Sequence, residues 1–297
     1  MKKPATRAFS CLIQSASMTD ILNNLFEAAL CCIEIKDPFE KASSTRALHK
    51  RWLGNELSTE SLDAPERIIN PGRPERPLLV SPRKVPKRSF YSRQGLNRLA
   101  HAIAHIEFNA INLALDAVYR FRSMPHDYYS DWLRVAAEES GHFLMLAQYL
   151  QTNDAQYGDL DAHNGLWEMA LKTDNDVMIR MALVPRVLEA RGLDVTPAMI
   201  DKLEQVGEQQ LVEILQVIHK EEIGHVLVGT RWFNYMCEQR ELSPRKVFVE
   251  LLDEYMNGVI QGPFDEDSRL QAGFTEDEMQ HLLEMSEKKG VFTTSSG

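Results

Sequence analysis

Residues 134–146 read RVAAEESGHFLML, and residues 217–229 read VIHKEEIGHVLVG. Each stretch contains the unit Glu-Glu-x-Gly-His, and in both the apolar residues recur every three or four positions. This spacing matches the period of an α-helix with one apolar face, so both stretches are predicted to lie inside helices. The sequence contains no convincing run of alternating apolar and polar residues, and we therefore expect an all-α fold.

The same periodicity extends over four long segments, at about residues 93–122, 127–150, 174–191 and 208–240. In the third segment, Pro185 is expected to kink the helix and Gly192 to end it. In each segment one glutamate occupies a position on the apolar stripe; these residues are Glu107, Glu139, Glu189 and Glu222. A buried ionised carboxylate without a partner is strongly destabilising, so we expect a positive group between the four helices.

Two of the four glutamates are followed three residues later by a histidine, Glu139 by His142 and Glu222 by His225. Residues three apart lie on one face of a helix, so each pair points into the same space. Helix bundles that hold two iron or manganese ions use two such Glu-x-x-His pairs and one glutamate from each of two further helices. Carboxylate and imidazole ligands suit these metals. The predicted ligands are Glu107, Glu139, His142, Glu189, Glu222 and His225.

A single Glu-x-x-His pair carries little information, because short pairs of this kind arise by chance. The chain holds a third copy, Glu278 and His281, which we interpret as a solvated face of a helix. The first two copies differ from it in their shared Glu-Glu-x-Gly-His unit and in their matched upstream glutamates: 107 to 139 is 32 residues, and 189 to 222 is 33. Glycine inside a helix is unfavourable, so its presence before both histidines predicts close backbone approach or a locally adapted helix.

Several residues near the predicted ligands have competing interpretations. Glu138 and Glu221 lie four residues before the two histidines but off the apolar stripe, and we assign them to solvent or to salt bridges. Arg186, three residues before the third glutamate, can reach the site and stabilise its carboxylates, but we favour a structural salt bridge. His101 and His105 lie off the face of the first glutamate and are expected to be core or surface residues.

The composition is that of a globular protein, with 297 residues of which 44% are hydrophobic and 26% charged. The formal net charge of −10 disfavours broad, non-specific binding to nucleic acid, whose phosphates it would repel. The four cysteines form no CxxC unit and are too few for a disulfide framework. No stretch reaches the roughly 18 apolar residues of a membrane span, and the first residues lack the apolar core of a secretory signal, so we expect a cytoplasmic protein.

The pattern divides the chain into four parts. Residues 1–64 predict an N-terminal helical extension, residues 92–240 the four long helices, and residues 241–297 C-terminal helices followed by a disordered tail. Residues 65–91 predict an extended arm, because six of the 13 prolines lie between positions 65 and 86. The arm is also rich in arginine and lysine, which indicates either a basic recognition strip or an arm laid over an acidic body. We favour the second, because the rest of the chain supplies the matching negative charge.

The six predicted ligands, together with stretches such as HIEFNAINLALDAVYRFR at residues 105–122, resemble the ferritin-like di-iron carboxylate superfamily. Within it, the chain looks like an uncharacterised bacterial group, domain-of-unknown-function family 455, over roughly residues 65–275. The resemblance implies a ferritin-like four-helix bundle and a dinuclear centre with two iron ions, or with manganese or a mixed Mn/Fe pair. It implies no substrate, since the family has no established one.

A reduced pair of metals held by carboxylates can bind and cleave dioxygen, so the first functional hypothesis is a di-iron oxygenase or oxidase. Such an enzyme needs a small-molecule substrate and an electron donor, which the sequence does not identify; a homodimer is a candidate oligomer. Three alternatives stay open: iron oxidation and storage, a tRNA-modifying hydroxylase supported only by the basic arm, and a non-enzymatic helical protein with a structural metal pair. Neither a nucleic-acid nor a membrane partner is expected.

Overall fold

The computed structural model describes residues 23–60, 64–86, 88–256 and 260–293, with side chains up to residue 286. Over these ranges the secondary structure is helical, with two isolated β-bridges and no strand, which confirms the expectation of an all-α chain. Within the same ranges, none of the helices combines the length and the apolar character that crossing a bilayer requires. Residues 294–297 of the predicted disordered tail lie outside the described residues.

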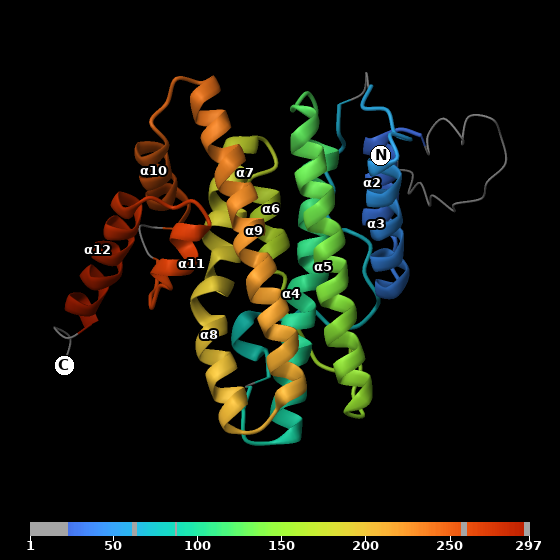
Figure 1. Ribbon diagram of the computed structural model, residues 1–297, viewed down its shortest axis with the longest axis vertical. Helices are drawn as coiled ribbons and strands as arrows, with labels where there is room; N and C mark the ends of the chain where they lie inside the picture. The colour runs from blue at the N-terminus through green and yellow to red at the C-terminus, as the bar shows by residue number, and fades with distance from the viewer. Residues whose placement is uncertain (1–22, 61–63, 87, 257–259, 294–297) are drawn as a thin grey trace, which may run out of the picture.

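Four long helical stretches lie side by side at the centre of the molecule (Figure 1). Three of them are single helices: α4 (Arg93–Arg120), α5 (His126–Thr152) and α9 (Gln209–Gln239). The fourth is built from three consecutive pieces: α7 (Val177–Leu183), η2 (Val184–Glu189) and α8 (Ala190–Gln205). Helix α5 packs against both α4 and α9, and the three pieces of the fourth stretch pack along α9. All four stretches therefore present one face to a common interior.

The fourth stretch differs from its sequence-based expectation. Residues 184–189 form a π-helical segment, and the chain continues as α8 through Gly192 instead of ending there. Pro185 has no backbone N–H, so one α-helical hydrogen bond is missing at this point, which accounts for the local change in bonding. Pro185 also packs tightly on α9, where a Cβ built on Gly229 would lie 2.2 Å from the Pro185 Cγ atom. Only glycine fits at that contact without a shift.

Two N-terminal helices, α2 (Leu25–Glu34) and α3 (Pro38–Leu53), pack against α4 and α5 respectively. Asp37 begins α3 by accepting hydrogen bonds from the backbone N–H groups of Phe39 and Glu40. The buried ammonium of Lys41 on α3 donates to the carbonyl of Ile33 and to Asn112 Oδ1 on α4. This side chain thus joins the N-terminal helices to the central ones.

The proline-rich arm runs in extended conformation over the surface of the helices, with one short 3-10 turn, η1 (Pro82–Lys84). Arg67 forms an ion pair with Asp174, and the carbonyl of Ile69 accepts a hydrogen bond of 3.0 Å from Trp167 Nε1. Further along, Leu79 forms a parallel bridge with Ala162. Through these contacts the described residues of the segment lie against the helices.

The remaining helices are α6 (Gly165–Lys172), α10 (Pro244–Met256), α11 (Glu266–Gln271) and α12 (Glu276–Thr293). The last three pack as a C-terminal layer beside α7, α8 and α9 (Figure 1). A buried, two-pronged ion pair holds this layer in place, because Arg269 Nε and Nη2 each lie 2.8 Å from the carboxylate of Asp194 on α8.

Candidate metal centre

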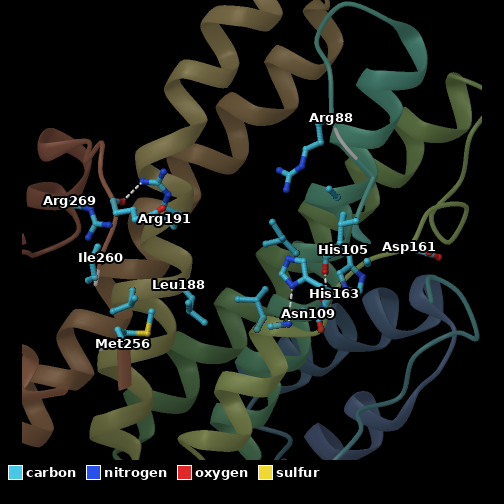
Figure 2. Close-up of a pocket in the computed structure, with 18 residues that line it drawn as sticks. Arg88, His105, Asn109, Asp161, His163, Leu188, Arg191, Met256, Ile260 and Arg269 are labelled. Atoms are coloured by element: carbon cyan, nitrogen blue, oxygen red, sulfur yellow. Dashed lines mark hydrogen bonds between the residues drawn. The ribbon is translucent and has the colours of Figure 1, made fainter. Parts of the chain in front are cut away.

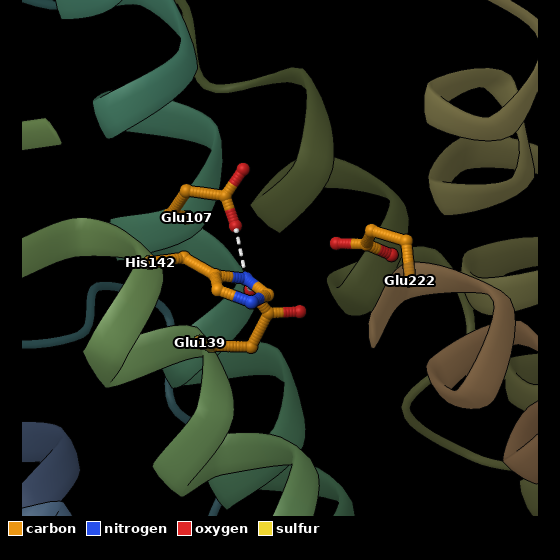
Figure 3. A group of neighbouring side chains, drawn as sticks. All are labelled: Glu107, Glu139, His142 and Glu222. Atoms are coloured by element: carbon orange, nitrogen blue, oxygen red, sulfur yellow. Dashed lines mark hydrogen bonds and ion pairs between the residues drawn. The ribbon is translucent and has the colours of Figure 1, made fainter. Parts of the chain in front are cut away.

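The interior of the four stretches contains a cluster of ionisable side chains where a hydrophobic core is expected. Glu139 and His142 on α5 and His225 on α9 are 0% exposed, while Glu107 on α4 is 2% and Glu222 on α9 is 8% exposed. One ligand atom from each of Glu107, Glu139, His142 and Glu222 lies within 4.8 Å of the others. Figure 3 shows these four side chains pointing toward one another from three helices. Such a group could hold a metal ion.

The two histidines meet the carboxylates through their Nδ1 atoms. His142 Nδ1 lies 3.2 Å from Glu107 Oε2 and 3.2 Å from Glu139 Oε2. His225 Nδ1 lies 2.9 Å from Glu139 Oε1 and 3.7 Å from Glu222 Oε1. Glu139 therefore stands between the two imidazoles, and five of the six predicted ligands are in direct contact.

Glu189, the sixth predicted ligand, is the last residue of the π-helical segment and is not one of the four whose ligand atoms lie within 4.8 Å of one another. Its carboxylate interacts electrostatically with the cluster. Burial, and then the negative charges of Glu222 and Glu139, raise the pKa of Glu189 well above the ordinary value. Its Oε2 atom is buried and has no hydrogen-bond partner among the described residues. Because Pro185 alters the helix one turn earlier, the register that positions Glu189 is not that of an ordinary α-helix.

The outer nitrogens of the histidines form a crossed pair of hydrogen bonds. His142 Nε2 on α5 lies 2.7 Å from Glu221 Oε2 on α9, and His225 Nε2 on α9 lies 2.8 Å from Glu138 Oε2 on α5. Since a carboxylate accepts, each Nε2 carries a proton, and Nδ1 is the nitrogen that faces the cluster, where it would bind a metal after losing its own proton. Glu138 also accepts from Arg134, at 2.8 Å. From the sequence, Glu138 and Glu221 are assigned to solvent or to salt bridges. Their ion pairs agree with the second option, but the histidines were not anticipated as partners, although the doubled glutamate of both motifs was an available signal.

The electrostatics of the cluster follow from its burial. Burial raises the pKa values of Glu107 and Glu222 above the ordinary value, and the neighbouring charge of Glu139 raises them further. Burial alone would also raise the pKa of Glu139, but His225 and His142 beside it lower that pKa below its usual range. Burial would lower the pKa values of the two histidines, but the surrounding carboxylates raise them well above normal. The cluster thus has a strong affinity for positive charge.

Several buried polar atoms in the cluster have no hydrogen-bond partner among the described residues: Glu139 Oε1, Glu189 Oε2, Glu222 Oε2 and His225 Nδ1. Glu139 Oε1 and His225 Nδ1 face each other at 2.9 Å without the alignment of a hydrogen bond. Orphaned buried polar atoms are rare, and a cation between them would satisfy carboxylate oxygens and an imidazole nitrogen at once. The donor set therefore fits a bound metal.

Arg186 does not contact the carboxylate cluster through any of its hydrogen bonds to described residues. Its guanidinium is buried, donates to Glu278 Oε1 at 2.7 Å, and lies 4.2 to 4.8 Å from the ring centroids of Phe233, Phe248 and Phe274. The favoured interpretation of Arg186, a structural salt bridge, agrees with this ion pair. The interpretation of Glu278 as part of a solvated face is wrong, because Glu278 is only 6% exposed and supplies the counter-charge that Arg186 requires.

His101 and His105 are buried on α4 outside the cluster, in agreement with the sequence analysis. His101 Nε2 accepts a hydrogen bond of 3.0 Å from the backbone N–H of Gly158. His105 Nδ1 lies 2.9 Å from the hydroxyl of Tyr157 and its Nε2 lies 3.1 Å from the carbonyl of His163. Burial lowers the pKa of His105 to about 4, so its ring is neutral near pH 7.

Comparison with known proteins gives the chain a family but no activity. A family model described as "Protein of unknown function (DUF455)" matches residues 34–280. A protein of Haemophilus influenzae described as uncharacterized is 42% identical over 280 residues, which cover 91% of this chain and 97% of that protein. No solved structure shows significant similarity to the chain. The sequence-based resemblance to this family is confirmed, and the match begins earlier than the proline-rich arm.

Proposed function

The chain belongs to the DUF455 family, and from its buried cluster we propose that it is a ferritin-like dinuclear metal protein. We infer that it is an oxidoreductase, which uses dioxygen to oxidise or hydroxylate a small organic substrate. The observation that carries the proposal is the convergence of two Glu-x-x-His units and further buried glutamates on one interior space. This is the donor arrangement of di-iron and di-manganese helix bundles.

The proposed ligands are Glu107, Glu139, His142, Glu189, Glu222 and His225, and the proposed metals are two iron ions, with manganese as the alternative. The four carboxylates together balance the charge of two divalent ions, which keeps a buried site near neutrality. Two ferrous ions would supply electrons for the reduction of dioxygen.

The protein's own groups prepare this site in two ways. Glu138 and Glu221 hold the two imidazoles through Nε2, so that each Nδ1 is fixed in orientation toward the cluster, where a metal would displace its proton. The burial of Glu139, His142 and His225 excludes bulk water, which strengthens every electrostatic interaction inside the cluster. Both effects favour a site that is already organised before any metal enters it.

The test is metal analysis of the protein isolated from its native host, beside the double variant Glu139→Ala/His142→Ala. We expect about two metal ions per chain in the natural protein and none in the double variant. His281→Ala is the matched control, since it removes the histidine of the third Glu-x-x-His unit and should leave the metal content unchanged. A natural protein without bound iron or manganese would contradict the metal centre.

Oxidoreductase activity requires a second measurement. After anaerobic loading with ferrous iron, exposure to air should consume dioxygen and change the optical spectrum, and neither change should occur in the double variant. Retention of two metals without any reaction with dioxygen would exclude the oxidoreductase and leave a structural metal pair.

A further inference from the structure

A cavity of about 470 Å³ lies between α4, the junction of η2 and α8, the loop before α6, and the C-terminal layer. Figure 2 shows residues from these separate parts of the chain facing one space. Its volume is within the range of pockets for small organic molecules. Ile106 projects into it and is 41% exposed, although the residues around it from Gly95 to Arg120 are buried or half-buried. An apolar side chain exposed in the middle of a buried helix indicates a place where a ligand can lie.

The cavity is distinct from the carboxylate cluster. On α4 it is lined by Ala102, His105, Ile106 and Asn109, but not by Glu107. At 3.6 residues per turn, Asn109 and His105 each lie roughly 200° around the helix from Glu107, on the opposite face. None of the six proposed metal ligands lines the cavity.

Most of the surface of the cavity wall is apolar. It includes Ile106 on α4, Leu166 on α6, Val187 and Leu188 on η2, and Ile260 in the C-terminal layer. His105 on the floor uses both ring nitrogens in hydrogen bonds to the protein. A molecule that fills this space must therefore present an apolar body to the walls.

The charges at the cavity favour an anion. Two of its arginines are already engaged: Arg269 is paired with Asp194, and Arg191 Nη1 donates to two backbone carbonyls at 2.9 and 3.0 Å and lies 3.5 Å from the same Asp194 carboxylate. Arg88 forms no hydrogen bond or ion pair within the described ranges, and in Figure 2 its guanidinium points into the space between His105 and Leu188. Asp161 lies at the edge of that view, with its carboxylate directed away. Arg88 thus faces the cavity as a cation with no carboxylate partner in the described parts of the chain.

We propose that this cavity binds an amphipathic organic carboxylate, whose carboxylate pairs with Arg88 and whose apolar body lies against Ile106, Leu188 and Ile260. A planar guanidinium suits this head group, because it can donate two parallel hydrogen bonds to one carboxylate. The proposal rests on the cavity alone and does not depend on the proposed metal centre.

The test is calorimetric titration of the full chain with decanoate, decanol and decylamine, probes of ten carbon atoms each that differ in their head groups. Decanoate should bind at least fivefold more tightly than decylamine. Arg88→Gln should weaken decanoate binding about fivefold or more and leave decanol binding unchanged. Arg83→Gln is the matched control, since Arg83 is an exposed arginine of the same arm that does not line the cavity. Equal effects of the two substitutions, or no preference for decanoate, would overturn the proposal.

Two further measurements separate the cavity from the metal cluster. Ala102→Phe should fill the cavity and abolish binding of both decanoate and decanol, with folding checked by circular dichroism. The titrations are repeated on chelator-treated protein and on the Glu139→Ala/His142→Ala variant, where decanoate binding should persist. Loss of binding in those samples would place the carboxylate at the metal cluster and would overturn the cavity assignment.

Discussion

Three glycines within or beside the Glu-Glu-x-Gly-His units allow a sharp test of how α9 packs on the π-helical segment. A Cβ built on Gly229 would lie 2.2 Å from Pro185 Cγ and 2.4 Å from Pro185 Cβ. A Cβ built on Gly141 or on Gly224 would have no neighbour within 4 Å. The expectation of close backbone approach at the glycines before the histidines is therefore wrong, and the close approach occurs one turn later, at Gly229.

The magnitudes follow from these contacts. Replacing glycine by alanine inside a helix stabilises it by about 1 kcal/mol where the space is open, as at Gly141 and Gly224. At Gly229 the new methyl group meets a rigid proline ring, and overpacking of this kind costs about 1–3 kcal/mol. The overlap at Gly229 places the cost near the upper end of that range. Gly229→Ala should therefore lower the free energy of unfolding by about 2 kcal/mol net, which corresponds to a fall of about 3 °C in Tm.

The assay is thermal and urea unfolding of the three single alanine variants in metal-free buffer, followed by metal analysis of each. Gly141→Ala and Gly224→Ala should unfold at or above the temperature of the natural protein. Gly229→Ala should unfold below it and should also lose metal, because Pro185 lies one turn before Glu189. If Gly229→Ala were as stable as Gly224→Ala, the packing of Pro185 on α9 would not be as described.

Three other expectations can be measured independently. Glu278→Ala leaves the buried guanidinium of Arg186 without a counter-charge and should lower the free energy of unfolding by about 3–5 kcal/mol in urea titrations; a loss under about 1 kcal/mol would contradict the pairing. Burial lowers the pKa of Lys41 to about 7, so above that pH the unfolded chain binds more protons at this residue than the folded chain does. The contribution of Lys41 to the free energy of unfolding should therefore rise between about pH 7 and pH 9. Lys41→Met should remove this pH dependence, and an unchanged slope would count against the lowered pKa. Glu138→Gln and Glu221→Gln should each weaken metal affinity by about 10-fold to 100-fold in chelator competition, whereas an effect of only one of them would contradict the crossed arrangement.

Much of the helical architecture can be predicted from periodicity alone. Helices α4, α5 and α9 begin and end within a few residues of the bounds predicted from the sequence, because a long amphipathic stripe is a strong signal for a helix. The chain around Pro185 could not be predicted in the same way. Proline forbids an ordinary hydrogen bond, but the adoption of π bonding and the continuation through Gly192 depend on packing against α9, which local sequence does not encode.

The site, too, could be predicted only in part: positions set by helical spacing could be predicted, and contacts that depend on how helices pack could not. Helical spacing placed Glu139 with His142 and Glu222 with His225 on common faces, and the structure brings both pairs to one cluster. The crossed bonds from Glu138 and Glu221 depend on the register of α5 against α9, and no single helix contains that information. Glu278 was accessible to sequence reasoning but was misread.

The signal for Glu278 was its place on the buried stripe of α12. Leu282, one turn after it, is 1% exposed, and Met279 beside it is 3% exposed, so the helix face around Glu278 is a buried one. Pairing with Arg186 then follows from the need of a buried carboxylate for a counter-charge. The apolar periodicity around Glu278 would have predicted its burial, whereas the Glu-x-x-His motif did not.

Without a bound cation, the buried carboxylate cluster should lower the free energy of unfolding, and this effect can be measured. Burial raises the pKa values of Glu189 and Glu222, and each has an orphaned Oε2 atom. Replacement of buried ionisable groups by apolar residues of similar volume is often stabilising by about 1–4 kcal/mol. Glu189→Leu/Glu222→Leu should therefore make the metal-free protein more stable in urea. Adding ferrous iron under anaerobic conditions should reverse the order, because ligand binding stabilises only the chain that retains the site. A double variant that is less stable without metal would mean that the two carboxylates serve the fold itself, and the reason to expect a metal between them would be lost.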